Sequence, residues 1–251
     1  IEEVQLDDVK AFFQKHYNPA NAILCISGNF EIENIKQLVE HWYGNIPGGI
    51  KPARILLQEP KQTEFRKAVY ERDVPADAFY YAFKMGERKS EEYYIADMLS
   101  DELGKEKSSV LYLKLKKELQ LVTDINAYIL GSLDQGLFII SGKMMNGKSM
   151  DELDSALWEV LDVFKLNPIT DQELTRLELA IRTSKEFQEQ GLLNRTMNLA
   201  YYELLGDANG INEEHEIYNA IEVEHLQELS KHLFVKENCS LLQIKATQSH
   251  E

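Results

Sequence analysis

Chain-breaking residues are concentrated at positions 46–52, and they constrain every fold that this chain can adopt. The segment Ile46-Pro47-Gly48-Gly49-Ile50-Lys51-Pro52 contains two prolines and two glycines. Proline has no amide hydrogen to donate inside a helix or a central strand, and glycine loses the most conformational entropy on folding. No regular element is expected to cross this segment. We therefore predict three parts, which are residues 1–47, a linker at 48–66 and a large domain at 67–251.

The first part has the pattern of a helix, a strand and a second helix. Apolar residues recur at helical spacing after Leu6, and Asn18-Pro19 ends this helix because proline cannot extend it. The short apolar run from Ala22 to Ser27 is typical of a buried strand. A second amphipathic helix follows and closes at Gly44.

The large domain alternates strand patterns with helix patterns. Ser149 with Glu152, and Thr170 with Glu173, are capping-box pairs that begin helices. Predicted strands cover residues 67–72, 79–85, two runs within 125–143, and 240–245. Predicted helices cover residues 90–103, 109–119, 149–165, 170–190, 193–205 and 223–233. The expected fold class is α+β, with a mostly antiparallel sheet covered by helices and preceded by the helix-strand-helix segment.

An internal repeat relates the two ends of the chain at a constant offset of 217 residues (238 − 21) without a gap. The aligned pairs are Val4 with Ile221, Val9 with Leu226, Phe12 with Leu229, Tyr17 with Phe234, Asn21 with Asn238, and Leu24 with Leu241. Chance agreement between two amphipathic helix-strand segments is the alternative explanation. A genuine repeat means that the chain holds the tail of one unit followed by one complete unit.

Composition excludes several classes of protein. Forty-two acidic and 27 basic residues give a net charge of −15, which repels phosphate backbones and anionic lipids, so neither nucleic acid nor membrane is expected as a partner. No apolar run approaches the ~20 residues of a membrane span, so a soluble protein is expected, in the cytoplasm or the periplasm. Two cysteines, Cys25 and Cys239, exclude a disulfide scaffold and suit small buried apolar positions.

Three segments together resemble the pitrilysin/insulinase-type zinc metallopeptidases, and the similarity covers nearly the whole chain. Residues 7–47 read DDVKAFFQKHYNPANAILCISGNFEIENIKQLVEHWYGNIP, like the family's helix, turn and strand ending in glycine. Residues 96–128 read ADMLSDELGKEKSSVLYLKLKKELQLVTDINAY, like its helix, glycine-containing turn and second helix. The final match is NLAYYELLG at 198–206.

The resemblance implies paired α+β domains that enclose an unfolded peptide, with zinc in one half only. The family binds zinc through an H-x-x-E-H motif, which supplies two histidine ligands and the carboxylate that activates water. No two of the six histidines fit that spacing; they are His16, His41, His215, His225, His232 and His250. Because the family places the motif early in the unit whose tail is residues 1–47, zinc is expected in the full-length protein or its partner, and no metal ligand is assigned here.

The resemblance also singles out two positions for substrate binding. The family has an arginine and, seven residues later, a tyrosine that hold the substrate carbonyl, and these positions fall on Lys116 and Thr123. Lysine keeps the positive charge but loses the bidentate fork of arginine, and threonine lacks the reach of a phenol. Lys116 and Thr123 are therefore the substrate-binding candidates, and no catalytic residue is assigned.

Other histidines and tyrosines suit ordinary structural roles. His225 and His232 share a predicted helix, and the repeat aligns His232 with Lys15, which favours a surface position over a metal site. His215 lies in an acidic stretch interpreted as a loop or a helix end. Four tyrosines are interpreted as core and rim residues rather than as the lining of a peptide chamber, and they are Tyr80, Tyr81, Tyr93 and Tyr94.

The leading hypothesis is a non-catalytic portion of a zinc metalloendopeptidase that encloses and positions peptide without hydrolysing it. Its expected partners are the peptide substrate and a zinc-bearing domain or subunit of the same family. The alternative is a structural or scaffolding homologue whose parent has no peptidase activity, and a third possibility is an unrelated α+β binding domain. An H-x-x-E-H motif in the ~200 residues upstream favours the peptidase, and its absence favours the scaffold.

Overall fold

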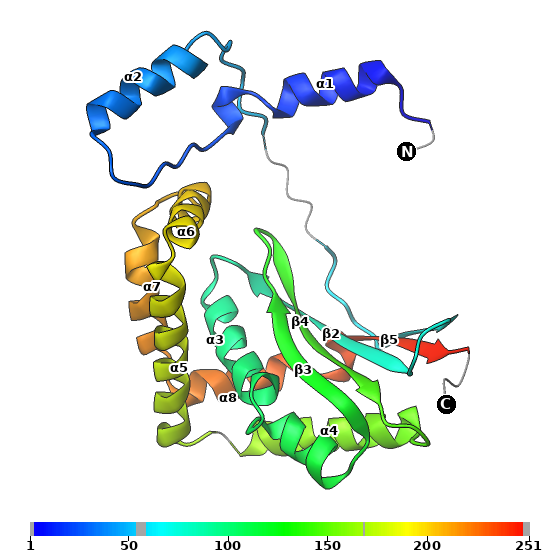
Figure 1. Cartoon of the computed structure of the whole chain (residues 1–251). Coiled ribbons are helices and arrows are strands. Elements are labelled where there is room, and N and C mark those ends of the chain that lie inside the picture. The colour runs from blue at the N-terminus through cyan, green and yellow to red at the C-terminus, as the bar shows by residue number, and fades with distance from the viewer. Residues whose placement is uncertain (1–2, 54–58, 168, 248–251) are drawn as a thin grey trace. The chain divides into compact units, whose positions relative to one another are not determined.

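The computed structural model describes residues 3–53, 59–167 and 169–247, and it divides into two units. The first unit contains residues 1–57 and 183–214, and the second contains residues 58–182 and 215–251. Figure 1 shows the elements of both units. The second unit holds the sheet and most of the buried apolar side chains.

A five-stranded sheet with the order β1-β5-β2-β4-β3 forms the centre of the second unit (Figure 1). Its strands are β1 (Arg66–Arg72), β2 (Ala78–Glu87), β3 (Val122–Leu130), β4 (Gln135–Met144) and β5 (Cys239–Ala246). Among the strand pairs of the described residues, only β1–β5 is parallel. The predicted α+β class with a mostly antiparallel sheet is confirmed, as are the strands expected in the large domain.

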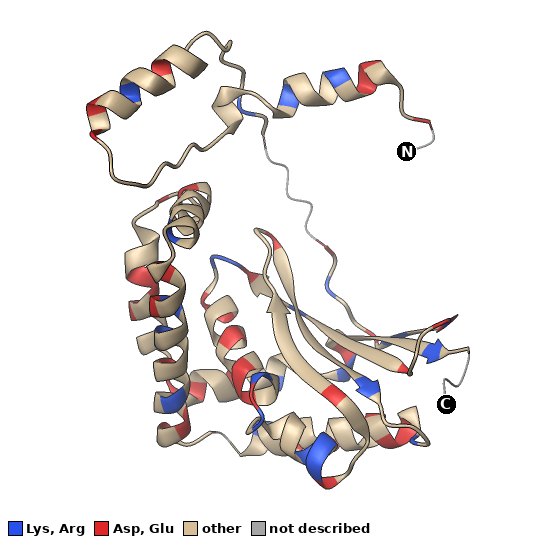
Figure 2. Ribbon diagram, in the orientation of Figure 1, with Lys and Arg blue, Asp and Glu red and all other residues tan. Residues whose placement is uncertain are grey.

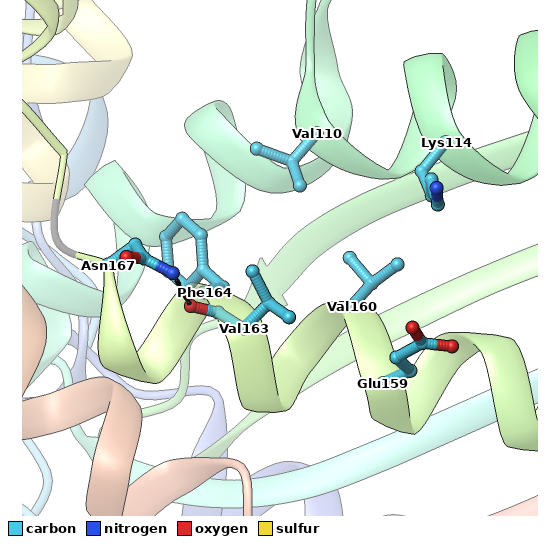
Figure 3. A pocket seen from close by; sticks show the side chains of 7 residues that line it. All are labelled: Val110, Lys114, Glu159, Val160, Val163, Phe164 and Asn167. Carbon is cyan, nitrogen blue, oxygen red and sulfur yellow. Dashed lines mark hydrogen bonds between the residues drawn. The ribbon is translucent and has the colours of Figure 1, made fainter.

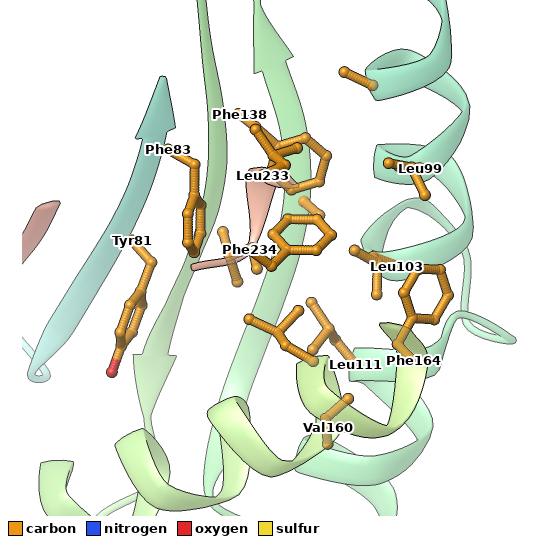
Figure 4. Packing of buried hydrophobic residues seen from close by; sticks show 14 of the residues in the cluster. Tyr81, Phe83, Leu99, Leu103, Leu111, Phe138, Val160, Phe164, Leu233 and Phe234 are labelled. Atoms are coloured by element: carbon orange, nitrogen blue, oxygen red, sulfur yellow. The ribbon is translucent and has the colours of Figure 1, made fainter. Parts of the chain in front are cut away.

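Helices cover one face of this sheet. α3 (Glu91–Ser100) contacts β2, β3 and β4, while α8 (Val223–Leu233) contacts β2, α3 and α4 (Met150–Leu166). Alternate residues of β2 point into this layer, as the period of a strand requires, and Phe79, Tyr81 and Phe83 are fully buried. Phe234 packs its ring against Phe83 at 5.3 Å and against Phe138 at 5.1 Å between centroids (Figure 4). This apolar face of β2 therefore forms one side of the core.

Both predicted capping boxes form and fix where two helices begin. The Ser149 N–H donates to Glu152 Oε2 at 3.1 Å, and the Glu152 N–H donates back to Ser149 Oγ at 3.2 Å. Thr170 and Glu173 make the equivalent pair at 2.7 and 3.3 Å at the start of α5 (Asp171–Gln190). Side-chain groups thus satisfy amides that have no partner inside either helix.

Two predicted helices contain π-helical turns. The helix expected at 90–103 is α3 followed by η2 (Asp101–Lys105), and the helix expected at 109–119 contains η3 (Tyr112–Glu118). β3 passes very close to η2, because a Cβ atom added at Gly104 would lie 2.1 Å from the Ala127 nitrogen. The glycine therefore permits this close approach.

One helix was not foreseen. Residues 213–216 were interpreted as a loop or a helix end, whereas they lie inside α7 (Gly210–Asn219). Tyr218 anchors the end of α7, since its hydroxyl donates to Asp97 Oδ2 at 2.6 Å and its ring meets Tyr94 edge-on at 5.2 Å. The helix was not predicted because residues 213–216 are mostly acidic, which is typical of an exposed loop. The residue that packs against α3, Tyr218, lies near the end of the helix.

The first unit contains α1 (Leu6–His16), the short 3₁₀ turn η1 (Pro19–Asn21), α2 (Ile32–Tyr43) and α6 (Leu192–Leu205). These helices were expected, but the strand predicted at 22–27 is wrong. The segment has no strand pairing with any described residue, and Ile23, Leu24 and Ile26 are 43, 59 and 42% exposed. Apolar composition favours a strand, but a strand also requires a paired neighbour.

Part of the predicted linker at 48–66, residues 54–58, lies outside the described residues. Another linker residue, Gln62, is buried, with only 5% of its surface exposed. The Gln62 Nε2 donates to the Cys239 carbonyl at 2.8 Å, and the Ser240 hydroxyl donates to Gln62 Oε1 at 3.1 Å. Residues around Gln62 are therefore fixed to β5. Residues 47–53 form neither helix nor strand, as the prolines and glycines predict.

Candidate functional site

η3 concentrates positive charge in a chain whose net charge is −15 (Figure 2). Lys116 Nζ lies 5.1 Å from the ring centroid of Tyr112, and Lys117 Nζ lies 5.7 Å from the same centroid. A π-helical turn brings residues five apart onto one side, so both lysines reach one tyrosine. Neither ammonium forms an ion pair with a described carboxylate. Two charged donors are therefore held by an aromatic face rather than neutralised.

A left-handed residue ends η3 and turns the chain into β3. Gln120 has φ +49°, and no other described residue except glycine has a positive φ. The Leu121 N–H donates to the Leu115 carbonyl at 2.9 Å across this turn. Helices commonly end in this way, with glycine preferred at the left-handed position. This turn fixes the direction in which the chain leaves η3, which carries Lys116, and enters β3.

Thr123 lies in a β-bulge at the start of β3. Val122 pairs with Met144 and Asp124 pairs with Lys143, so Thr123 has no partner of its own in the ladder. It is exposed, and its hydroxyl donates only a long 3.4 Å bond to the Lys143 carbonyl. No hydrogen bond within the described chain joins Thr123 to Lys116. Both assignments as substrate-binding residues stay predictions.

The Lys116 ammonium can act only as a charged hydrogen-bond donor. A lysine ammonium can donate to a carbonyl or carboxylate oxygen, but it is a point charge and lacks the fork that holds such a group in two places. The Thr123 hydroxyl can donate one further hydrogen bond. These groups can donate hydrogen bonds to the carbonyl oxygens of a peptide.

A cavity of about 380 Å³ lies between the start of η3 and the second half of α4 (Figure 3). It is lined by Val110, Lys114, Glu159, Val160, Val163, Phe164 and Asn167. Lys114 is paired with Glu118 at 2.5 Å, whereas Glu159 has no ion pair within the described residues. The sequence did not predict this cavity. Val163 on α4 lines it and is 52% exposed, which is unusual for an apolar residue.

The face of the sheet opposite the helices is partly open. Tyr80 on β2 and Tyr128 on β3 retain 37 and 36% exposure, while Tyr81 on the helix side is fully buried. Tyr94 is also buried, and Tyr93 is half-buried against the Arg88 guanidinium. The core position of Tyr81 and Tyr94 is confirmed, whereas the role of the more exposed Tyr80 and Tyr93 stays a prediction.

The described side chains do not fit a zinc centre. Nowhere in residues 3–53, 59–167 and 169–247 do three histidine, cysteine, aspartate or glutamate side chains gather closely enough to hold a metal ion. His225 has a structural role, since its Nδ1 accepts the Glu222 N–H at 3.0 Å at the start of α8. His215 and His232 are exposed, and His250 lies outside the described residues.

Among the described residues, none of the helices has the length and apolar character that a bilayer span requires.

Comparison with known proteins supports the family resemblance. The chain is 27% identical over 183 residues to "Zinc protease PqqE" of Helicobacter pylori, covering 71% of this chain and 41% of that protein. It is 22% identical over 232 residues to "Uncharacterized zinc protease YmxG" of Bacillus subtilis, covering 92% and 56%. The chain thus spans about half the length of these curated relatives.

The fold is also shared with a solved structure. The crystal structure of a protease from Helicobacter pylori superposes with a TM-score of 0.89 at 21% identity, over 97% of this chain and 59% of that one. In addition, the family model described as "Peptidase M16 inactive domain" matches residues 3–180, well over half of the sequence. This chain therefore belongs to the peptidase M16 inactive-domain family.

Proposed function

We propose that the chain is the non-catalytic portion of a zinc metallopeptidase and that it encloses and positions a peptide substrate. The zinc centre then lies in a segment outside this chain or in a partner of the same family. Membership in the M16 inactive-domain family carries this proposal. It is supported by two curated relatives that are named zinc proteases and are longer than the matched chain.

Two surfaces of this chain are assigned to the peptide. The Lys116 ammonium, held over Tyr112 without a carboxylate partner, binds a backbone carbonyl of the substrate, and Thr123 donates a further hydrogen bond. The open face of the sheet around Tyr80 and Tyr128 provides half-exposed aromatic rings against which an unfolded segment can lie. Both surfaces belong to the second unit.

The proposed organisation retains the three parts expected from the sequence. Residues 1–47 are the tail of a preceding peptidase-like domain, 48–66 are a linker, and 67–251 form a complete peptidase-like domain without a zinc motif. Supporting this division, one sheet is built from strands that all lie between Arg66 and Ala246.

The test compares peptide hydrolysis by the 251-residue chain with hydrolysis by the full-length protein, each with and without a chelator. We expect an H-x-x-E-H motif upstream in the full-length protein, or in a co-purifying partner. We further expect hydrolysis that the chelator abolishes and zinc restores, and none by this chain alone. Chelator-sensitive hydrolysis by the 251-residue chain would overturn the proposal. Absence of hydrolysis from the full-length protein and its partner would favour the scaffolding alternative.

A further inference from the structure

Residues 59–64, named the strap from here on, are fastened to the open face of the sheet at two points. The first point is Lys84 on β2. Its neighbours on either side along the strand are buried in the core, so the Lys84 side chain points to the opposite, open face. The Lys84 ammonium pairs with Glu59 Oε2 at 2.6 Å and donates to the Pro60 carbonyl at 3.1 Å. The start of the strap therefore lies on the open face.

The second point is Ser240 on β5. Ser240 lies between two core residues of that strand, so its side chain also points to the open face. The Ser240 hydroxyl donates to Gln62 Oε1 at 3.1 Å. The Gln62 Nε2 donates to the Cys239 carbonyl at 2.8 Å and to the Glu64 carbonyl at 3.0 Å. These three hydrogen bonds explain how a polar side chain can be buried here.

The strap lies at one end of the sheet, and Thr123 lies at the other. Through β4, Lys84 is aligned with Leu130 at the end of β3, whereas Ala78 is aligned with Asp124, next to Thr123. Lys84 follows Ala78 by six residues along β2, which corresponds to roughly 20 Å of strand. The strap therefore covers the end of the open face that is remote from Thr123.

Between these two ends the open face is an apolar surface. Ile139 on β4 points to it, because its two neighbours along the strand belong to the core. Ile139 pairs with Tyr128 on one side and with Ala82 on the other. Tyr80 lies two residues before Ala82 on the same face and is 37% exposed. An unfolded segment that lies here meets apolar side chains and two tyrosine hydroxyls.

We propose that the strap closes the Lys84 end of the open face and confines a bound peptide to the part between Ala82 and Thr123. Gln62 is the positioning residue, because its three hydrogen bonds hold the strap in place. The strap also uses the Lys84 ammonium, a charged donor that could otherwise bind a substrate carbonyl. Substrate carbonyls are thereby left to the donors at the other end, Thr123 and Lys116. This inference rests on the proposed function, in which the open face binds the peptide.

The consequence is a limit on the length of peptide that this face can hold. Residues 78–82 of β2 line the uncovered part, so an extended peptide crosses it with about five residues. Release of the strap makes the rest of β2 available, together with the Lys84 donor. A strap with only a structural role would change the stability of the chain without changing this dependence on peptide length.

Gln62→Ala in the 251-residue chain tests the strap, because it removes the three hydrogen bonds. Fluorescence anisotropy gives the Kd of two labelled unfolded peptides of the same uncharged composition, with about five and about twelve residues. We expect the parent chain to bind both peptides within about threefold of each other. Gln62→Ala should bind the longer peptide about tenfold more tightly and the shorter one unchanged, because a hydrogen bond to the freed Lys84 ammonium becomes available.

A second substitution separates this gain from a change in stability. Adding Lys84→Met to Gln62→Ala should remove most of the gain in affinity for the longer peptide, because the freed donor is then lost. Ser240→Ala removes one hydrogen bond and keeps the two that Gln62 Nε2 donates. It should give the same pattern with a smaller gain of about threefold, and it replaces Gln62→Ala if that variant does not fold.

Trypsin cleavage after Lys61 measures release of the strap directly. Lys61 is exposed, but cleavage requires the chain around it to leave the sheet. Gln62→Ala should be cut there about tenfold faster than the parent chain. Thr63→Ala is the matched control, since Thr63 is exposed and its hydroxyl makes no hydrogen bond within the described chain. It should leave the cleavage rate and both Kd values unchanged.

The outcomes distinguish this inference from the proposed function. Faster cleavage after Lys61 in Gln62→Ala, with an unchanged Kd for the longer peptide, would overturn the inference alone. Weaker binding of both peptides by Gln62→Ala would also overturn it, because the strap would then be part of the binding surface. Absence of binding by the parent chain and by every variant would refute the assignment of the open face to the peptide, and the inference with it.

Discussion

The Tyr81 hydroxyl donates a 2.8 Å hydrogen bond to Asp154 Oδ1, and this bond joins β2 at the centre of the sheet to α4 in the helical layer. The Tyr81 ring is fully buried. Burial, followed by the nearby Asp154 carboxylate, raises the pKa of Tyr81 far above its ordinary value. The tyrosine therefore stays a hydrogen-bond donor at ordinary pH, and the half-buried Asp154 carboxylate accepts this bond.

Tyr81→Phe should destabilise the second unit by about 1–2 kcal/mol, because it leaves the Asp154 carboxylate without this donor while keeping the ring. Urea unfolding followed by Trp158 fluorescence measures the change, in a Trp42→Phe background that silences the first unit. Tyr80→Phe, on the open face of the same strand, is the control and should stay within about 0.5 kcal/mol. Equal losses from both variants would contradict the importance of the bond.

Gln120→Gly should stabilise the second unit by about 0.5–1 kcal/mol, because glycine adopts the left-handed region without the steric cost that a side chain incurs there. Gln120→Val should destabilise it, since a β-branched residue fits φ +49° poorly. The same urea unfolding gives both values. The two variants control for each other, because their changes in unfolding free energy should have opposite signs. A loss of stability in both variants would contradict the left-handed conformation of Gln120.

Glu102 should make stability depend on pH between its ordinary pKa of 4.5 and a higher value in the folded protein. Burial raises its pKa, with the Arg176 guanidinium acting against that rise. In this window the folded state holds the proton more tightly than the unfolded state, so stability falls as pH rises. Glu102→Gln removes one titrating group and should reduce the slope, measured by urea unfolding at several pH values. A smaller slope of the same sign remains, because burial also raises the pKa of Asp101.

The exposed Glu228→Gln on α8 is the control for this pH effect and should keep the slope of the parent chain, because Glu228 lies outside the cluster of Asp101, Glu102 and Glu106. An unchanged slope in Glu102→Gln would contradict the assignment. Any change in absolute stability reports the lost ion pair with Arg176 and is separate from the slope.

Lys116→Ala in the full-length protein should lower kcat/KM for peptide hydrolysis about tenfold or more, because it removes a charged donor to the substrate carbonyl. Lys117→Ala is a matched control, since its ammonium lies over the same Tyr112 ring. Lys116→Arg should retain activity, because it keeps the charge and adds the fork. Equal losses from Lys116→Ala and Lys117→Ala would indicate lost packing on Tyr112 instead of substrate binding.

Local chemistry made much of the fold predictable. The capping boxes at Ser149 and Thr170 mark where their helices begin, because each rests on hydrogen bonds between residues three positions apart. The alternation of Phe79, Tyr81 and Phe83 identifies the buried face of β2. Such features depend on neighbours in the sequence, so the sequence alone is enough to find them.

Features that depend on distant segments were not predictable in the same way. The run at 22–27 has the composition of a strand, but pairing is decided by another segment, and no described residue pairs with it. The bulge at Thr123 arises from the register between β3 and β4. The cavity beside Val163 depends on how α4 and η3 face each other. Lys116 could be named from a resemblance, whereas the second cation over Tyr112, Lys117, is five residues away and depends on the π-helical turn.

Zinc content, measured together with peptide hydrolysis, tests most directly that this chain is the non-catalytic portion. The 251-residue chain and the full-length protein, with any co-purifying partner, are loaded with zinc, dialysed and analysed for metal, and the same samples are assayed on an unfolded peptide. We expect about one retained zinc for each zinc-bearing domain of the full-length sample, with hydrolysis that a chelator removes. We expect neither in the 251-residue chain. A stoichiometric zinc held by the 251-residue chain, together with chelator-sensitive hydrolysis, would contradict the proposal.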